Sequence, residues 1–494
     1  MAIPSAGKAL RRIAWLTPVR FVLILLSSAA ALAQQPTPAT PPTVAPVSRD
    51  IPRPAELQRD VDFWIRVYSE ITTLQGFLHD ERNLAIVYST LSLPPTERPG
   101  SPVRRQLIDA ERERWSKALR EAADSIQTES LADGATERGS AAASADAQRV
   151  IELWGAEASA DSLRLAAESV RFQLGQADRF RAGIVRSGQW ESHIARTFDS
   201  LGLPPELAAL PHVESSFTPT AYSKVGASGL WQFMPGTGRR FMRVDDIVDE
   251  RLDPFRATEA AAKLLLYNYR TLGSWPLAIT AYNHGTAGMR RAREQLGTDD
   301  FAVIARRYQS RSFGFASRNF YPSFLAALTI DQNPQRYFPD VQRATELVFH
   351  EVSMPGYAEV ATLERALGIP RETLRELNPA LRPAVWSGEK FVPRGYRLRL
   401  PSSESLSAAQ LIAQVGADRL FVAQLAPRTH TVAPGETLTR IAKRYGFSVA
   451  DLAQINELPA DAKLRRGQRL RLADERPATL ASALSLESAA GAAP

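Results

Sequence analysis

Glu214 has the local setting of a general acid. Pro204 and Pro205 suit the first turn of a helix, which we expect to continue through 211–217. Glu214 then lies at the C-terminal end of that helix, where the negative end of the helix dipole disfavours ionisation. Apolar walls come from Leu210, Val213 and Phe217. Both effects raise the pKa of a carboxyl group, as a general acid near neutral pH requires. The competing interpretation is a solvated surface glutamate, the usual situation of this residue type.

Residues that can bind an amide-bearing sugar follow Glu214 between Ser215 and Asn283. Small residues let the backbone approach a ligand, aromatic rings stack on sugar faces, and Asn or Gln side chains bond to amides and hydroxyls. The candidates are Ser215, Ser223, Gly229, Trp231, Gln232, Tyr282 and Asn283. Each type also has a structural interpretation, with Trp231 as a core residue and Gly229 as a turn residue. Together the set favours an N-acetylated sugar as the ligand.

The elements that position these residues are predicted to be helices. From 190 to 333 the chain reads as helices separated by short turns marked by Gly and Pro, and we expect the catalytic domain over 181–340. Before it, apolar residues recur at three- and four-residue spacing, as on one face of a helix. They are Phe63, Val67, Ile71, Leu74 and Leu78, followed by Leu107, Trp115, Leu119 and Ile126. The pattern predicts a helical accessory region over 55–180.

The first residues have the pattern of an export signal. Basic residues precede an apolar run over 21–32, which closes on Ala31-Leu32-Ala33. The run is too short to cross a bilayer comfortably, because a spanning helix needs about 20 residues. We therefore expect a signal peptide over 1–33, cleaved after Ala33, with a retained anchor as the alternative. The proline-rich stretch over 34–54 reads as an extended linker, and 474–494 as a disordered tail.

Two stretches near the C-terminus share one pattern, over 345–401 and 428–473. Each has an apolar strand, a short helix ending at Gly, a second short helix ending at Asn, and a strand with Arg and Leu. In the second stretch, Gly446 ends the first helix and Ser448 opens the next with a capping box. Repeats of this size are usually binding modules.

Composition excludes several classes of protein. Hydrophobic residues make up 44% and charged residues 23% of the 494, which is typical of soluble globular domains. The chain has no cysteine, which excludes disulfides, thiolate metal sites, a cysteine nucleophile and an acylated N-terminal cysteine. A net charge of +7 suits an anionic partner such as a cell-wall polymer, although it is also consistent with solubility alone. A nucleic-acid binder is disfavoured because the basic residues are scattered and an exported chain has no use for such a partner.

Three motifs together resemble a known enzyme family. Val213-Glu214-Ser215, Gly229-Leu230-Trp231-Gln232 and Ala281-Tyr282-Asn283, in this order and spacing, are similar to the soluble lytic transglycosylase domain of glycoside hydrolase family 23. Within that family the chain most resembles the membrane-bound lytic murein transglycosylase D type, and the likeness covers about 172–330. It implies a lysozyme-like helical fold that cuts between N-acetylmuramic acid and N-acetylglucosamine and leaves a 1,6-anhydro-muramyl end.

The resemblance also implies roles for single residues. Glu214 matches the catalytic acid/base, while Ser223, Gln232, Tyr282 and Asn283 match positions that hold the N-acetyl and hydroxyl groups of the substrate. The chain departs from the pattern at His284, where the family often has Ala. It also departs near the end of the domain, where alignment on Pro322 puts Phe320 at the position of a family tyrosine. We assign that role to Tyr321, one residue on. The absent N-terminal cysteine removes the lipid attachment of many D-type relatives.

The stretch over 429–472 resembles a LysM module, which implies binding of glycans that contain N-acetylglucosamine. The residues expected to contact the glycan are Gly435, Thr437, Leu438 and Asn456. The stretch over 345–401 looks like a degenerate LysM that lacks the Gly-Glu-Thr turn. The expected fold class is therefore mainly α, with a lysozyme-like helical catalytic domain, a helical N-terminal region and small βααβ LysM modules at the C-terminus.

The function expected from these features is that of a peptidoglycan lytic transglycosylase of the periplasm, working in wall turnover. The expected partner is the peptidoglycan glycan strand, without nucleic acid, and the chain is expected to be a monomer with possible peripheral membrane association. Substrate-assisted cleavage needs one carboxyl group and no metal or organic cofactor. Two alternatives remain open. A hydrolytic muramidase would use a second carboxylate from Asp245, Asp246 or Asp249, although that run reads better as a solvated acidic loop, and a wall-binding protein would use the modules without catalysis.

Overall fold

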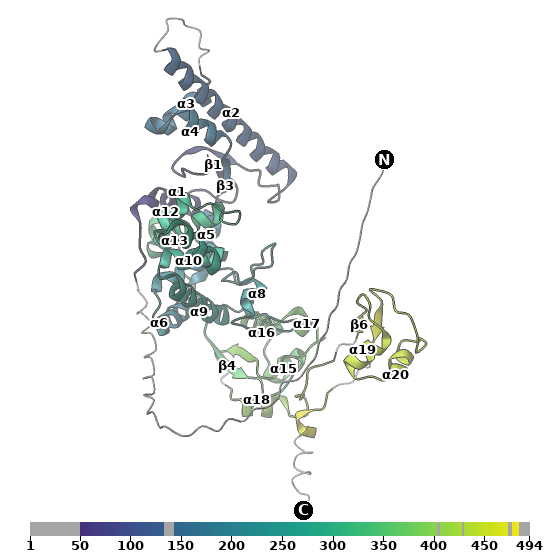
Figure 1. Ribbon diagram of the computed structural model, residues 1–494. Helices are drawn as coiled ribbons and strands as arrows, with labels where there is room; N and C mark the ends of the chain where they lie inside the picture. Colours follow the sequence, from purple (N-terminus) through teal and green to yellow (C-terminus); the bar gives the residue numbers. More distant parts are fainter. Residues whose placement is uncertain (1–49, 133–142, 403–405, 427–428, 473–476, 484–494) are drawn as a thin grey trace, which may run out of the picture. The chain divides into compact units, whose positions relative to one another are not determined.

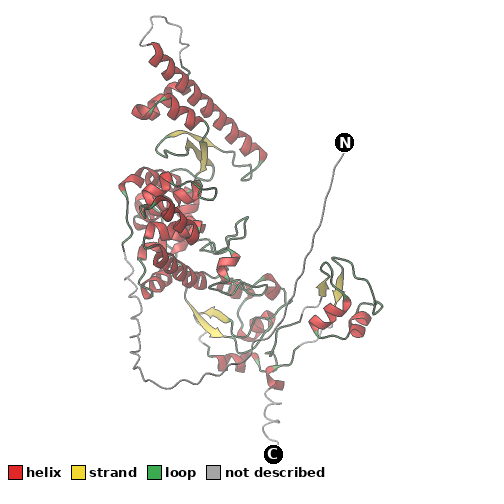
Figure 2. Cartoon of the chain, in the orientation of Figure 1, coloured by secondary structure: helices red, strands yellow, loops and turns green. Residues whose placement is uncertain are grey.

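The computed structural model describes residues 50–132, 143–402, 406–426, 429–472 and 477–483. Helices make up most of these residues, and strands occur only as one three-stranded and two two-stranded sheets (Figure 2). The mainly α fold class is confirmed. The predicted signal peptide and most of the predicted linker lie outside the described residues. Among the described helices, none is long and apolar enough to cross a membrane.

The catalytic domain is a bundle of short helices around one large core. Its elements are α5 (Ala177–Ser187), α6 (Glu191–Ser200), η3 (Pro205–Ala209), α7 (Leu210–Ser215), α8 (Pro235–Gly238), η4 (Glu250–Leu252), α9 (Pro254–Leu272), α10 (Trp275–His284), α11 (Thr286–Leu296), α12 (Phe301–Arg307), α13 (Phe315–Gln332) and α14 (Pro334–Tyr337). The same core includes α1 (Gln58–Ser69), which follows η1 (Ala55–Leu57) and packs along α13 (Figure 1). The domain therefore recruits a helix from well before its predicted start.

The accessory region is not wholly helical, so that prediction was wrong in part. Strands β1 (Gln75–Asp80), β2 (Val87–Ser92) and β3 (Val170–Leu174) form an antiparallel sheet with β1 in the centre. The helix predicted through Leu78 ends at Ser69, and Leu78 lies in β1. Three β-branched residues, Ile71, Thr72 and Thr73, separate helix from strand and favour extended backbone. Apolar spacing alone could not show this boundary, because two adjacent elements together imitated one helix face.

Three helices build a second core against this sheet. They are α2 (Pro102–Ala132), α3 (Ala145–Trp154) and α4 (Ala160–Ala167), with the short η2 (Gly155–Glu157) between the last two. Trp115 and Leu119 of α2 are buried against Tyr88 of β2, and the Trp115 and Tyr88 rings stack 5.6 Å apart. The helical prediction is confirmed for this part of the region. Residues 133–142 of the predicted helical region lie outside the described residues.

Both C-terminal modules have the predicted strand–helix–helix–strand order. The first comprises β4 (Phe349–Ser353), α15 (Val360–Leu367), α16 (Arg371–Leu377), an inserted α17 (Pro383–Trp386) and β5 (Arg397–Pro401). The second comprises β6 (Thr429–Thr431), α19 (Leu438–Tyr445), α20 (Val449–Ile455) and β7 (Arg469–Arg471). In each, an asparagine after the second helix donates to a carbonyl of the last strand: Asn378 to Arg399 at 2.9 Å and Asn456 to Arg471 at 2.8 Å. The shared bond supports reading both as versions of one unit.

Part of the predicted disordered tail is ordered. Residues 477–483 come after the second module, and they pair through backbone hydrogen bonds with the loop that follows α18 (Ala408–Val415) of the first. Val422 donates to Ala478 at 3.0 Å and Leu480 donates to Leu420 at 2.6 Å. Leu480 packs against the core of the first module. The described portion of the tail is therefore a part of that module.

Candidate active site

Glu214 occupies the last turn of α7, as predicted. The next two residues, Ser216 and Phe217, have left-handed backbone with φ of 49° and 53°. Side chains larger than glycine adopt this conformation at a cost in free energy, and consecutive examples are uncommon. The turn that follows Glu214 is therefore held by its surroundings rather than by local preference.

Helix α5 supplies the restraint. Arg186 donates to the carbonyl of Phe217 at 3.0 Å and to the carbonyl of Ser216 at 2.6 Å, so one guanidinium fixes both left-handed residues. Gly183 lets α5 approach, because a Cβ there would lie 3.0 Å from the Ser216 carbonyl oxygen. Neither residue was identified from the sequence. Their only sequence signal is a glycine and an arginine spaced by three on one helix face.

Behind α7, a buried histidine ties the helix to α13. His212 Nε2 lies 2.9 Å from Asp331 Oδ1, and Arg343 donates to the same Asp331 oxygen at 2.9 Å. The His212 ring stacks on Phe180 with centroids 4.5 Å apart. These contacts place the α7 backbone, and with it Glu214, relative to both neighbouring helices.

Glu214 is one of the residues that line a cavity of about 540 Å³. Burial raises the pKa of Glu214 to about 8, so the group holds its proton at neutral pH. The α5 side of the cavity is polar and was not anticipated from the sequence; it consists of Gln176, Asp178, Arg179 and Arg186. The site therefore offers a protonated carboxyl at an open, polar cavity, which is the arrangement that general acid catalysis requires.

Three of the predicted site residues converge on one backbone segment, 229–232. Ser215 donates to the Leu230 carbonyl at 2.7 Å, and Tyr282 of α10 donates to the Trp231 carbonyl at 2.9 Å. Gln232, itself left-handed with φ of 48°, donates to the Gly229 carbonyl at 2.8 Å. The structure thus brings together three motifs that are well separated along the chain.

Gly229 is required by its surroundings as well as by its backbone. Its φ is 82°, and an added Cβ would lie 1.6 Å from the Arg251 carbonyl oxygen. Arg251 is itself buried and forms an ion pair with Asp249 at 2.8 Å. It also donates to the carbonyls of Gly226 and Phe233 at 2.8 and 3.0 Å, which fixes the hairpin that carries Gly229.

Two residues predicted for the site lie elsewhere. The Trp231 side chain is fully buried and donates to Thr258 at 2.9 Å, so it cannot stack on a sugar. The Tyr321 hydroxyl donates to the Pro52 carbonyl, and its ring packs on Phe301 and Phe324. Both corrections have one physical cause: an apolar ring on a core-facing helical or hairpin position gains more from burial than from a polar cleft.

A tyrosine from α1 lies near Glu214 instead. Burial raises the pKa of Tyr68, and the Glu214 charge raises it further, as it also does for Tyr282. The Tyr68 hydroxyl shares a hydrogen bond with the Ser323 side chain of α13. Tyr68 was missed because α1 lies far before Glu214 in the sequence and was assigned to a separate region.

The remaining predicted residues lie at the ends of local elements. Ser223 accepts a hydrogen bond from the Ala227 backbone at 2.9 Å and so closes its turn. Asn283 is exposed at the end of α10, where Ser317 donates to its carbonyl oxygen at 3.2 Å. Ser317 also lies 3.2 Å from His284 Nδ1. The departure from the family at His284 is thus accommodated by α13.

The run predicted as a solvated acidic loop is solvated at Asp245 and Asp246, which are exposed, but it also packs on the first module through Val248. Asp249 is buried in its pair with Arg251, and its backbone N–H donates to the Ala380 carbonyl of the first module at 2.8 Å. Asp245 accepts from the backbone of Ile247 and Val248 at 2.8 and 2.7 Å. The apolar residues inside the run were the signal for this packing. Two of the three carboxylates proposed for a hydrolase are thus committed to structural bonds.

In the second module, the predicted glycan-contact residues divide into two kinds. Gly435 is an exposed turn residue with φ of 77°, and Thr437 caps α19 by accepting from the Arg440 backbone. Leu438 is buried in the module core, and the Asn456 amide bonds to the Leu452 and Arg471 carbonyls. Leu438 and Asn456 therefore shape the module, which leaves the Gly435–Thr437 turn as the accessible part.

Comparison with known proteins identifies two domains in the chain. Residues 198–304 match the family model for the Transglycosylase SLT domain, and residues 430–473 match that for the LysM domain. The membrane-bound lytic murein transglycosylase D of Escherichia coli K12 is 31% identical over 289 residues, which cover 56% of this chain and 62% of the relative. The chain thus spans less than two thirds of that relative's length. A putative tributyltin chloride resistance protein of Alteromonas is 36% identical over 102 residues, covering 20% of this chain and 49% of its own.

Two solved structures are also similar over part of the chain. One is an inactive mutant of the lytic transglycosylase Slt from Pseudomonas aeruginosa, with 22% identity over 30% of this chain and 24% of the other. The other is the 70 kDa soluble lytic transglycosylase from Escherichia coli, with 25% identity over 31% of this chain and 24% of the other. The TM-score is 0.25 for each.

Proposed function

We propose that this chain, which carries a Transglycosylase SLT domain and a LysM domain, is a peptidoglycan lytic transglycosylase. It cleaves the β-1,4 bond between N-acetylmuramic acid and N-acetylglucosamine and leaves a 1,6-anhydro-muramyl end. The observation that carries the proposal is Glu214 of the SLT domain, which is protonated at neutral pH and lines a cavity whose other side is polar and comes from α5. The test is the chemical nature of the product end.

Glu214 acts first as an acid and then as a base. Its proton passes to the glycosidic oxygen, the bond to C1 of the muramic acid breaks, and the 2-acetamido group of that sugar stabilises the oxocarbenium-like centre. The Glu214 carboxylate then takes the proton from the C6 hydroxyl, whose oxygen attacks C1 in the same ring. Glu214 ends the cycle protonated, as it began. Water is not consumed, so the reaction is that of a lyase.

Three polar side chains, which do not themselves line the Glu214 cavity, are assigned the role of orienting the substrate. Ser223 is held by the Ala227 N–H and has its own hydroxyl hydrogen to donate to the acetamido group. Gln232 is anchored through its amide nitrogen on Gly229 and offers its carbonyl oxygen to a substrate N–H. Asn283, exposed at the end of α10, contacts sugar hydroxyls. Hydrolysis is the weaker candidate because Asp245 and Asp249 are taken up by structural bonds.

The raised pKa of Glu214 predicts how activity depends on pH. The acid form is the one that reacts, so kcat/KM should be flat below about pH 7 and fall about tenfold per pH unit above about 8. The measurement is a pH profile on soluble glycan strands, checked by circular dichroism for unfolding at each pH. A profile that rises with pH through this range would contradict the acid role of Glu214.

The same shift predicts a stability effect. A carboxyl whose pKa is raised on folding favours the folded state most below its unfolded pKa, and this contribution is lost as pH rises toward about 8. Replacement by neutral glutamine removes the cost of ionising a buried group. The melting temperature of Glu214→Gln minus that of the parent chain should therefore increase between about pH 5 and pH 9. Equal differences at both pH values would argue that Glu214 is not buried as described.

The LysM domain should hold the enzyme on the wall without taking part in the chemistry. Strands β6 and β7 pair side by side, with Thr429 opposite Arg471, so excision of 429–472 joins two neighbouring ends. Residues 477–483, which belong to the first module, are kept in this variant. Binding to purified sacculi should fall about tenfold or more, while turnover of short soluble glycans should stay within about twofold. Unchanged sacculus binding would remove the glycan-binding role from this domain.

The cellular setting follows from the same proposal. The chain is exported by the signal over 1–33, works in the periplasm on the wall as a monomer, and associates at most peripherally with a membrane. Cell fractionation with N-terminal sequencing should find the mature chain in the periplasm, beginning near Gln34. An intact N-terminus in the membrane fraction would favour the retained anchor.

A further inference from the structure

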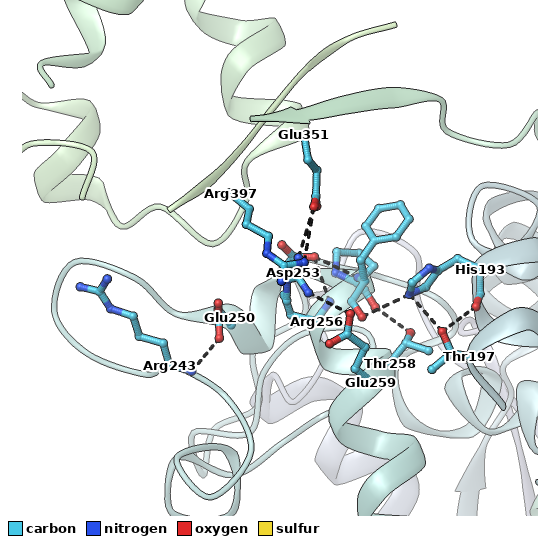
Figure 3. Close-up of polar contacts among 12 residues, drawn as sticks. His193, Thr197, Arg243, Glu250, Asp253, Arg256, Thr258, Glu259, Glu351 and Arg397 are labelled. Atoms are coloured by element: carbon cyan, nitrogen blue, oxygen red, sulfur yellow. Dashed lines mark hydrogen bonds and ion pairs between the residues drawn. The ribbon is translucent and has the colours of Figure 1, made fainter. Parts of the chain in front are cut away.

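The first C-terminal module is bonded to the catalytic domain rather than tethered to it. Arg382 donates from its backbone to Ile247 at 3.0 Å, and the side chain of Val248 is buried in the core of the module. The Arg399 guanidinium of β5 lies 2.7 Å from the Asp253 carboxylate, and both are buried. Glu351 of β4 forms a further ion pair with Arg399 at 3.0 Å. It also pairs with Arg256 of α9 at 3.3 Å (Figure 3). Removing one partner of such a buried pair is costly, so the junction is a fixed part of the structure.

A groove of about 1060 Å³ lies at this junction. One wall comes from the catalytic domain and includes Pro219, Thr220 and Tyr222. The other comes from α16 and α17 of the module and includes Thr373 and Trp386. The groove is larger than the Glu214 cavity, whose volume is about 540 Å³, so it has room for more than one sugar unit.

The groove and the cavity at Glu214 share one wall segment. Thr218 and Ala221 line the Glu214 cavity, whereas Pro219, Thr220 and Tyr222 line the groove. One short segment, 218–222, therefore forms the boundary of both spaces.

The groove has the chemistry of a sugar-binding surface. The Tyr222 side chain is 53% exposed, and its hydroxyl is fixed because it donates to Asp249 at 3.2 Å and accepts from Arg382 at 2.9 Å. An exposed ring that is held in place binds a sugar face without losing further side-chain entropy. Hydrogen-bonding groups stand opposite on α16, where Arg375 and Glu376 are exposed. An aromatic platform with polar and charged groups around it suits a hydroxyl-rich glycan chain.

We propose that the junction groove binds a second section of the glycan strand that is being cut at Glu214. The module then extends the catalytic cleft through α16 and α17, together with the segment 218–222 of the catalytic domain. It does not act as an independent LysM. This inference rests on the proposed function for the identity of the polymer. It implies that the enzyme prefers strands long enough to reach from Glu214 into the groove.

The test is a comparison of long and short substrates in the full chain. Thr373→Trp fills the groove from α16, and Glu389→Trp places the same bulk on an exposed part of the module outside the groove. The substrates are peptide-free glycan strands fractionated by length. Thr373→Trp should lower kcat/KM for long strands about tenfold and leave short strands within about twofold, whereas Glu389→Trp should change neither. The proposal would be overturned if the ratio of kcat/KM for long strands to that for short strands were unchanged in Thr373→Trp. An equal loss of kcat/KM for long strands in Glu389→Trp would also overturn it.

A second variant guards against misfolding of Thr373→Trp. The double variant Arg375→Ala/Glu376→Ala removes two exposed side chains from the groove and should cost little stability. It should lower the ratio of kcat/KM for long strands to kcat/KM for short strands by at least about threefold. A ratio equal to that of the parent chain would overturn the proposal in this background as well.

Binding measured without turnover separates this inference from the proposed function. In Glu214→Gln, calorimetric affinity should increase with strand length, and Thr373→Trp added to that chain should remove the increase. If affinity increases with strand length but the parent chain cleaves no glycan, the proposed lytic function is wrong and the groove proposal is supported. Cleavage with no length dependence would mean that the groove proposal fails alone.

Discussion

Glu214→Gln should lower the turnover of peptidoglycan by a factor of about 10² to 10⁴ or more while the protein stays folded and bound to sacculi. Glutamine keeps the shape of the side chain but has no proton to give to the glycosidic oxygen. Because the parent carboxyl is buried and its pKa is about 8, the exchange removes a destabilising group rather than a structural one. The measurement is release of soluble fragments from sacculi, with thermal melting recorded for both proteins.

The control for this prediction is Glu294→Gln on α11. Glu294 is exposed and lies 3.5 Å from Arg290 in a surface ion pair, which contributes little to stability. Its replacement should leave turnover unchanged. Substantial residual activity in Glu214→Gln would place the catalytic acid elsewhere, whereas a joint loss of activity and of the folded state would assign Glu214 a structural role.

Gly229→Ala should destabilise the catalytic domain by more than about 4 kcal/mol and abolish activity. The alanine would cost about 1–2 kcal/mol for its left-handed backbone, where φ is 82°. The larger part comes from the Cβ, which would lie 1.6 Å from the Arg251 carbonyl oxygen, so the hairpin and its buried ion pair would have to separate. Chemical denaturation followed by tryptophan fluorescence measures the effect.

Gly226→Ala is the matched control for that prediction. Gly226 has φ of 90°, but the nearest atom to an added Cβ is 4.0 Å away. It should therefore lose only the backbone contribution of about 1–2 kcal/mol. If the two variants were equally stable, the close approach of Gly229 to Arg251 would not be a feature of the protein in solution.

The position of Glu214 could be read from the sequence because it depends on one local element. Proline at the predicted helix start and the number of residues from there to Glu214 are enough to place the carboxyl in the last turn. The convergence of Ser215, Gln232 and Tyr282 followed from the family motifs rather than from the residues themselves. Their detailed role differs from the expectation, since all three bond to the backbone of 229–232.

The supporting residues could not be predicted, because they act across elements that are distant in sequence. Arg186 and Gly183 are ordinary members of α5 until α7 is placed against them. Tyr68 required knowing that α1 packs in the catalytic core. Trp231 and Tyr321 show the opposite error. Motif position suggested the cleft for both, but each ring is enclosed by packing that only the tertiary structure defines.

The docking of the first module was also hidden in the sequence. The run 244–250 has enough carboxylates to read as solvated, yet its Ile247 and Val248 are the residues that pack on the module. Asp249 points inward because Arg251 pairs with it, whereas Asp245 and Asp246 are exposed. A charged run that encloses β-branched residues is therefore weak evidence for a solvated loop.

The most direct test of the central claim is mass spectrometry of the products formed from purified peptidoglycan in water labelled with heavy oxygen. A lytic transglycosylase joins the C6 oxygen of the muramic acid to C1, so the products should carry 1,6-anhydro ends, be lighter by one water than hydrolysis products, and contain no label. Reducing ends that carry the heavy oxygen would contradict the account, because they would show that water rather than the C6 hydroxyl attacks the bond next to Glu214.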